Sequence, residues 1–119
     1  MSTEPMPNFY IDMESRATVD LTNPGEMVPG SMTITRIIVG DEDKRGMGFG
    51  SQLLKQVCQD ADRTETILSL EINPYGALTY EELRDWYTRY GFFEATDWPG
   101  VYLRVPGAPI RPVHEGFPV

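Results

Sequence analysis

One glycine-rich segment holds the residues whose types and spacing are best suited to chemistry. Residues 45–51 read RGMGFGS and follow an apolar run, IIV, at 37–39. Glycine at alternate positions allows backbone turns that a Cβ would block, and lets a ligand approach the main chain closely. If a helix begins here, its first N–H groups lack helical partners and the helix dipole adds positive potential. This combination is typical of a site for phosphate or another anion.

Two well-known phosphate loops do not match this segment. The chain contains no G-x-x-x-x-G-K-[ST] pattern, so nucleotide hydrolysis of the P-loop type is unsupported. It also lacks a G-x-G-x-x-G fingerprint with an acidic residue about 20 positions further on, which disfavours dinucleotide binding. Arg45 adds a positive charge at the mouth of the loop.

Carboxylates that could act as a general base are harder to select. Glu71 lies between Leu70 and Ile72 in an apolar segment, and burial there would raise the pKa of its carboxyl group. The competing interpretation, which strand alternation favours, is that Glu71 points to solvent between two core-facing neighbours. Asp41 and Asp43, just after the apolar run, are alternatives, as is a chain of water molecules.

The elements that must position these residues follow from hydrophobic periodicity. A helix beginning near Gly48 places apolar residues, including Cys58, on one face, and we interpret Cys58 as a core residue. A second helix begins near Thr79, which forms a capping box with Glu82, and ends near Gly91. Strands are predicted at 8–13, 17–21, 32–39, 67–72, 92–96 and 101–105. The order is β-β-β-α-β-α-β-β, a mixed α/β (α+β) pattern around one sheet.

Composition and charge narrow the function classes. The chain has 119 residues, which is typical of one domain, and its net charge is −8. This charge disfavours nucleic-acid binding and favours cationic partners such as amines. A single cysteine excludes an internal disulfide and any zinc site built from several cysteines, so no metal site is expected. We find no signal peptide or membrane span in the sequence, and expect a cytoplasmic protein.

Two motifs in this order resemble the GNAT superfamily of N-acetyltransferases. The family signature [QR]-x-x-G-x-[GA], after a strand and opening a helix, reads RGMGFG at 45–50. A second motif, an aromatic residue shortly before Gly-Phe, reads YTRYGF at 87–92. The resemblance covers about residues 32–105 and implies a GNAT-like mixed sheet, with two central strands that splay apart at the cofactor cleft.

The resemblance implies acetyl-CoA as acyl donor and direct transfer to a primary amine. The pyrophosphate would lie on the amides of the glycine loop, and the pantetheine arm along the strand before it. The implied cofactor-binding residues are Ile37, Ile38, Val39, Arg45, Gly46, Met47, Gly48, Phe49, Gly50, Ser51 and Asn73. Tyr87 matches the tyrosine that protonates the departing thiolate, since a phenol with a pKa near 10 is protonated at neutral pH. Tyr90 and Trp86 are interpreted as packing residues, and Glu71 as the carboxylate candidate for the base.

The chain also departs from the family pattern. Only about 31 residues precede the main strand, and four prolines interrupt them, so the N-terminal helices that often build the acceptor pocket are not predicted. Tyr80 stands seven residues before Tyr87, where the family has an asparagine, whereas Asn73 is fourteen residues before it. An alternative function is therefore a catalytically inactive GNAT-like module that binds a partner protein.

The expected organisation is a single domain at 1–105 followed by a Pro-rich C-terminal tail at 106–119. Four prolines in the tail predict an extended, semi-flexible segment. A homodimer is a further hypothesis, in which a second copy or the tail completes the acceptor side. The sequence does not identify the acceptor.

Overall fold

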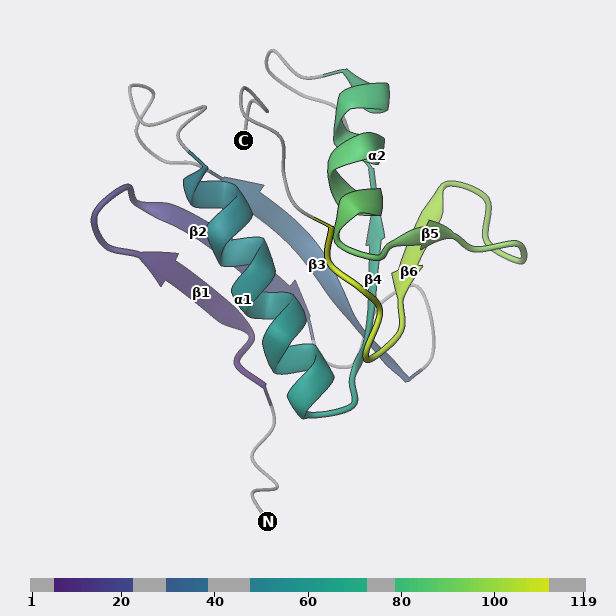
Figure 1. Ribbon diagram of the computed structural model, residues 1–119, viewed down its shortest axis with the longest axis horizontal. Coiled ribbons are helices and arrows are strands. Elements are labelled where there is room, and N and C mark those ends of the chain that lie inside the picture. Colours follow the sequence, from purple (N-terminus) through teal and green to yellow (C-terminus); the bar gives the residue numbers. More distant parts are fainter. Residues whose placement is uncertain (1–5, 23–29, 39–47, 73–78, 112–119) are drawn as a thin grey trace.

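The computed structural model describes residues 6–22, 30–38, 48–72 and 79–111, which form one sheet and two helices (Figure 1). The strands are β1 (Phe9–Asp12), β2 (Ala17–Thr22), β3 (Ser31–Ile38), β4 (Ile67–Glu71), β5 (Phe93–Glu94) and β6 (Val101–Arg104). The helices are α1 (Phe49–Arg63), between β3 and β4, and α2 (Tyr80–Arg89), between β4 and β5. The expectation of a mixed α+β architecture is confirmed.

The six strands lie in the order β1-β2-β3-β4-β6-β5. Every neighbouring pair is antiparallel except β3 and β4, which are parallel. The parallel pair is connected through α1, as a crossover between parallel strands requires. The last two strands form the expected antiparallel pair, although β5 is only two residues long.

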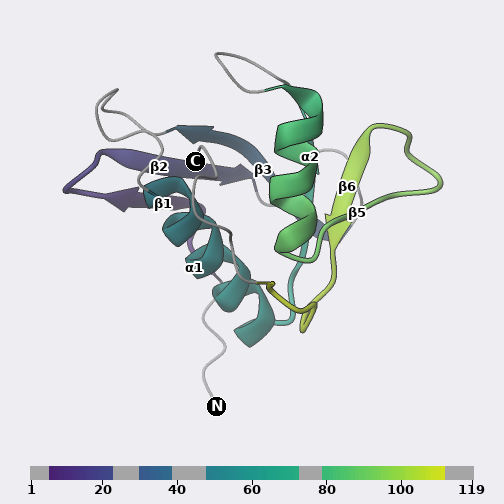
Figure 2. The same cartoon turned by 45° about the horizontal axis from the view of Figure 1, so that its top comes forward.

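Both helices lie on the same side of the sheet (Figure 2). In β2 the buried residues alternate with half-exposed ones, so one face of that strand points toward the helices. In α1 the buried apolar residues are those of the predicted stripe: Leu53, Leu54, Val57, Cys58 and Ala61. The core therefore lies between one face of the sheet and two amphipathic helices, as the periodicity predicted.

The central strands β3 and β4 pair over only a short length. Their ladder joins Ser31–Ile67, Met32–Leu68 and Thr33–Ser69. Beyond Thr33, β3 continues to Ile38 alongside β2 while β4 continues to Glu71 alongside β6. The carboxyl ends of the two strands diverge in Figure 1. The splay expected near 37–39 is present and begins earlier, directly after Thr33.

A β-bulge in β3 accompanies this divergence. Asp20 of β2 pairs with Arg36, whereas the next residue, Leu21, pairs with Ile34. Thr35 is therefore the additional residue, and its hydroxyl donates to the Asp20 carbonyl at 3.2 Å. A bulge bends its strand and shifts which side chains face the core. Thr35 and Arg36 are consequently both exposed.

The ends of α2 are fixed by local sequence. Thr79 and Glu82 form the predicted capping box, with each side chain accepting the other's backbone N–H. At the other end, Phe92 N–H donates to Tyr87 O and Gly91 N–H to Thr88 O, the Schellman pattern. Gly91 has φ 94°, and a Cβ there would lie 2.7 Å from the Ala108 Cβ. Glycine is thus required both by backbone conformation and by the segment packed against it.

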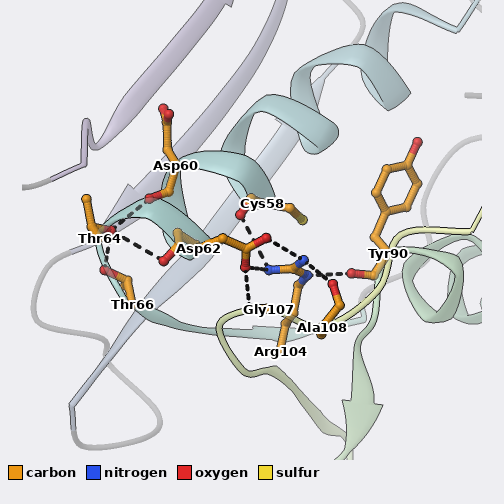
Figure 3. A network of polar contacts seen from close by, with 10 residues as sticks. Cys58, Asp60, Asp62, Thr64, Thr66, Tyr90, Arg104, Gly107 and Ala108 are labelled. Carbon is orange, nitrogen blue, oxygen red and sulfur yellow. Dashed lines mark hydrogen bonds and ion pairs between the residues drawn. The ribbon is translucent and has the colours of Figure 1, made fainter.

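A buried arginine joins the carboxyl-terminal ends of both helices (Figure 3). Arg104 of β6 is fully buried, and its Nε donates to the carbonyl of Tyr90, the C-cap of α2, at 2.5 Å. Its guanidinium forms a fork with the Asp62 carboxylate at 2.7 and 3.3 Å, and also donates to the Cys58 carbonyl. The charge-assisted bond to Tyr90 satisfies a carbonyl that the end of α2 leaves without a helical partner.

The start of the Pro-rich segment is held against this arginine. Arg104 donates to the Ala108 carbonyl at 2.6 Å, and Gly107 N–H donates to Asp62 at 2.7 Å. Further along, Arg111 N–H donates to the Arg89 carbonyl at 2.7 Å. Residues 107–111 therefore make hydrogen bonds near the carboxyl-terminal ends of both helices. The sequence did not reveal these contacts.

Candidate functional site

The amino end of α1, where the sequence predicts an anion site, begins at Gly48 without a side-chain cap. Gly48 is the N-cap, with φ 87° and ψ 8°, a left-handed conformation that suits glycine. It provides no side-chain cap, and the first turn contains no acidic residue. The first helical bond runs from Gln52 N–H to Gly48 O, so the amides of Phe49 and Gly50 precede it. With the dipole's positive end, this geometry favours negative charge.

The end of β3 leads from the divergent strands to this helix. Ile37 pairs with Val19 and Ile38 with Thr18, and both isoleucines are half-buried. Since α1 follows β3 in the chain, the end of β3 and the start of α1 lie at the carboxyl edge of the sheet. At this level β4 no longer pairs with β3. The sequence predicts the cofactor cleft at this edge.

Several predicted site residues lie outside the described residues. They are Val39, Arg45, Gly46, Met47 and Asn73, together with the alternative carboxylates Asp41 and Asp43. Their assignments remain predictions from the sequence.

Aromatic side chains of α2 fasten that helix to the first turn of α1. The indole N–H of Trp86, which is 1% exposed, donates to the Ser51 hydroxyl at 2.9 Å. The phenol of Tyr90 donates to the Ser51 carbonyl at 3.3 Å. Burial raises the pKa of Tyr90, although its bond to Ser51 acts in the opposite direction. Trp86 and Tyr90 are core residues, as predicted, and they also fix the position of the candidate anion site.

Tyr87 lies in the same aromatic group. Its ring centroid is 4.9 Å from that of Trp86 and 5.6 Å from that of Phe92, the latter in an edge-on arrangement. Tyr87 is 9% exposed, so only a small part of it reaches the surface. The predicted acid thus stands beside Trp86, its neighbour in sequence, whose indole bonds Ser51 of α1, 35 residues earlier in the chain.

Glu71 is exposed at the end of β4, opposite Val101 of β6. The idea that its neighbours Leu70 and Ile72 bury its carboxylate is wrong. Those neighbours are buried, and strand alternation turns Glu71 to the other side, as the competing interpretation held. A role for Glu71 as a base would therefore rest on its place at the carboxyl edge and not on desolvation.

Sequence reasoning missed a pair of phenols beside α2. The hydroxyls of Tyr80 and Tyr102 lie 3.1 Å apart, and Tyr102 is 3% exposed. Burial, followed by the bond to Tyr80, raises the pKa of Tyr102 to about 12, so it remains protonated at neutral pH. Tyr80 and Tyr87 are seven residues apart and share one helix face. The seven-residue spacing could have drawn attention to Tyr80, but only the fold places Tyr102 beside it.

Other residue types contribute little to this site. Burial raises the pKa of the Cys58 thiol to about 12, which keeps it in the unreactive thiol form and supports its interpretation as a core residue. Among the residues that the structure describes, no group of three His, Cys, Asp or Glu could hold a metal ion. Neither α1 nor α2, the helices of the described ranges, has the length and apolar character needed to cross a bilayer.

Comparison with known proteins relates this architecture to several solved structures. No family model matches the chain, and no curated protein matches it. The anti-CRISPR protein AcrVA5 matches with a TM-score of 0.62 and 18% identity, over 82% of this chain and 98% of the other. The KacTA–DNA complex matches with a TM-score of 0.49 and 20% identity, over 75% of this chain and 56% of the other. A protein assigned to the GNAT family of acetyltransferases from Desulfovibrio desulfuricans gives 0.45 and 25%, over 73% and 55%.

The likeness to AcrVA5 shows a shared fold. The mixed six-stranded sheet with two helices is consistent with a GNAT-like fold. Activity, acyl donor and acceptor are a separate matter, because a fold can be shared by proteins of different function.

Proposed function

We propose that this protein is an acetyl-CoA-dependent N-acetyltransferase that acts on a primary amine. The observation that carries the proposal is the divergence of β3 and β4 next to the amino end of α1. The separation of β3 from β4 would accommodate the extended arm of a ligand. The first turn of α1, which has no acidic residue, would suit a diphosphate. The paired sequence motifs point to the same ligand.

Among the described residues, the first turn of α1 and the end of β3 fit such a donor. The amides of Phe49 and Gly50, with the dipole of α1, would bind the diphosphate, and Gly48 in its left-handed conformation keeps a side chain away. Ser51 belongs to the same turn, and Arg45, Gly46 and Met47 are proposed to extend it. Ile37, Ile38 and Val39 would offer main-chain groups to the arm, with Asn73 as an additional contact.

Acetyl-CoA supplies an acetyl group as a thioester. The amine nitrogen would form a bond to the acetyl carbon as the carbon–sulfur bond breaks, and the thiolate would take a proton from the Tyr87 phenol. A main-chain N–H near Val39 would stabilise the developing oxyanion. The proton lost by the amine would pass to water or to Glu71, and the Tyr87 phenolate would regain a proton from solvent.

The acceptor is proposed to be a small molecule or a protein that carries a primary amine. The net charge of −8 attracts cations and repels nucleic-acid phosphates. The exposed carboxylate of Glu71 lies at the same edge as the proposed donor site. Whether the natural acceptor is free or part of a protein would follow from an acetylation assay with both kinds of amine.

Calorimetry tests donor binding directly. We expect saturable binding of acetyl-CoA and much weaker binding of acetyl-pantetheine, which lacks the diphosphate. No heat of binding at millimolar acetyl-CoA would remove the proposal. Equal affinity for the two ligands would leave an acyl donor but contradict the role of the α1 amides.

A non-catalytic module that binds a partner protein is the competing function. The burial of Tyr87 among aromatic rings favours it, because that packing alone could account for the residue. Acetyl-CoA binding without turnover on any amine of a broad panel would support the competing function.

A further inference from the structure

The outer edge of β1 carries unpaired main chain beside exposed apolar side chains. β1 is the terminal strand of the sheet, and no described helix or strand lies along its outer side in Figures 1 and 2. Phe9 is 48% exposed and Ile11 47% exposed. Exposed edge strands are templates for pairing with another strand, and proteins usually protect them with charge, proline or a bulge.

The hydrogen-bond alternation of the β1–β2 ladder fixes which residues face outward. Leu21 N–H donates to the Asn8 carbonyl at 2.9 Å, so Asn8 bonds toward β2. In an antiparallel pair, bonded and non-bonded positions alternate, which places Tyr10 and Asp12 among the inward-bonding residues. Phe9 and Ile11 then direct their N–H and C=O groups to the open edge. The two residues with exposed apolar side chains are therefore also the ones with available main-chain groups.

We propose that this edge is the interface of a homodimer in which β1 pairs antiparallel with β1 of a second copy. Only one register uses both outward residues within the strand. It places Phe9 opposite Ile11 of the other copy, with Tyr10 on the two-fold axis. Shifting the register one way would bring Ile11 opposite Pro7, which has no N–H, and shifting it the other way would bring Phe9 opposite Met13, which lies in the turn.

The second copy is the occupant because this register is self-complementary. Each Phe9–Ile11 pair would exchange two backbone hydrogen bonds and place two apolar side chains side by side on the face away from the helices. Asp12, the charged residue of β1, would lie opposite Asn8 and not opposite another carboxylate. The contact therefore avoids like-charge pairs although each chain carries a net charge of −8. The sequence analysis proposed a different dimer, in which the second copy completes the acceptor side of the active site.

Sedimentation equilibrium from micromolar to millimolar protein tests the proposal. We expect a monomer–dimer equilibrium that Phe9→Lys or Ile11→Lys weakens about tenfold or more, because the two-fold axis duplicates each lost pair. Met13→Lys is the matched control, since Met13 is 80% exposed and the charge change is the same. Circular dichroism checks that the variants remain folded. A monomer at all concentrations, or a dimer insensitive to both edge substitutions, would overturn the proposal.

Disulfide trapping tests the register. Phe9→Cys and Ile11→Cys chains, mixed and oxidised, should give a crosslinked heterodimer, because opposed residues lie about 5.5 Å apart between Cα atoms. Either variant alone should crosslink far less, because its two cysteines would be separated by more than about 7 Å. Cys58 is buried and does not compete. Equal crosslinking of each variant with itself would refute this register.

Discussion

The two ends of α1 differ in the contacts that the rest of the chain makes with them. At the carboxyl end, Arg104 and the segment from Gly107 to Arg111 bond the carbonyl of Cys58, the carboxylate of Asp62 and the end of α2. At the amino end, Gly48 provides no side-chain cap and the first turn has no acidic residue. Near one end the helix is bonded by Arg104 and the segment after it, whereas the other end, the proposed anion site, has no side-chain cap.

The contrast places structural contacts near one end of the helix and the proposed anion site at the other. A buried charge is costly unless it is paired and fully hydrogen-bonded, so the Arg104 end tolerates little change. An amino terminus exposed to solvent loses little when unoccupied, because water can bond its N–H groups. Trp86 and Tyr90 connect the two ends, since α2 is capped near Arg104 and contacts Ser51 near the open end. Four substitutions test whether the two ends differ in this way.

Arg104→Met should have the largest effect. It removes the buried guanidinium that donates to the Asp62 carboxylate and to the carbonyls of Tyr90 and Ala108. We expect a loss of about 3–5 kcal/mol in the free energy of unfolding, measured by urea denaturation. Arg111→Met, at an exposed arginine of the same segment, is the control and should change stability far less. Similar losses in both variants would contradict the central role of Arg104.

Tyr87→Phe should separate catalysis from binding. If the phenol protonates the leaving thiolate, kcat should fall about 100-fold or more while the dissociation constant of acetyl-CoA changes little. Steady-state kinetics and calorimetry measure the two quantities. Tyr90→Phe is the control, because its hydroxyl bonds the Ser51 carbonyl and should affect stability more than kcat. An unchanged kcat in Tyr87→Phe would remove the acid role.

Asp62→Asn should change the pH dependence of stability. Desolvation would raise the pKa of Asp62, but the bonds from Arg104 and Gly107 outweigh it and hold that pKa below its ordinary value of 3.8. Because the folded pKa is the lower one, this stabilisation is present above about pH 4 and is lost as pH falls through the folded pKa. We expect the variant to lose about 2 kcal/mol at pH 7, less than a fully buried pair, since Asp62 is partly exposed.

Denaturation curves at several pH values measure this effect. The difference between Asp62→Asn and the wild type should shrink below pH 4. Asp12→Asn is the control, because bonds from Ser15 also lower the pKa of Asp12, which lies at the end of β1 and makes no contact with Arg104. A constant difference between Asp62→Asn and wild type across this range would show that the ionised carboxylate is not the cause.

Gln52→Glu should have the smallest effect, at the open end. Gln52 is exposed beside the first turn of α1, and an acid there interacts well with the dipole but repels a bound phosphate. We expect acetyl-CoA affinity to fall about two- to fivefold, with helix stability preserved or slightly increased. Gln59→Glu, the same change near the other end of the helix, should leave affinity unchanged. Equal effects of both would indicate a general charge effect.

Much of the fold could be predicted from the sequence because its signals are local. The 3.6-residue spacing of Leu53, Leu54 and Val57 identified α1 and its buried face. Thr79 with Glu82, and Gly91, marked the ends of α2 because capping bonds join residues close in sequence. The glycine at 48 likewise marked the start of α1, where its left-handed conformation was found.

The candidate site was predicted less completely, because its geometry depends on contacts between distant segments. No local pattern links Trp86 to Ser51, or Tyr80 to Tyr102. The bulge at Thr35 was also missed, since it appears only when β2 and β3 are placed in register. Glu71 shows the reverse case, in which strand alternation was the better guide and the proposed burial failed.

The sequence by itself determined where each helix and strand lies, which face of each is apolar, and which glycine-rich segment opens α1. Those properties depend on the conformational preferences and hydrophobicity of neighbouring residues. Only the tertiary structure decided that β4 leaves β3 after Thr33, that Arg104 bonds groups near the carboxyl-terminal ends of both helices, and that β1 ends the sheet with Phe9 and Ile11 exposed. These features arise from pairing and packing between segments far apart in the chain, where no local preference specifies the partner.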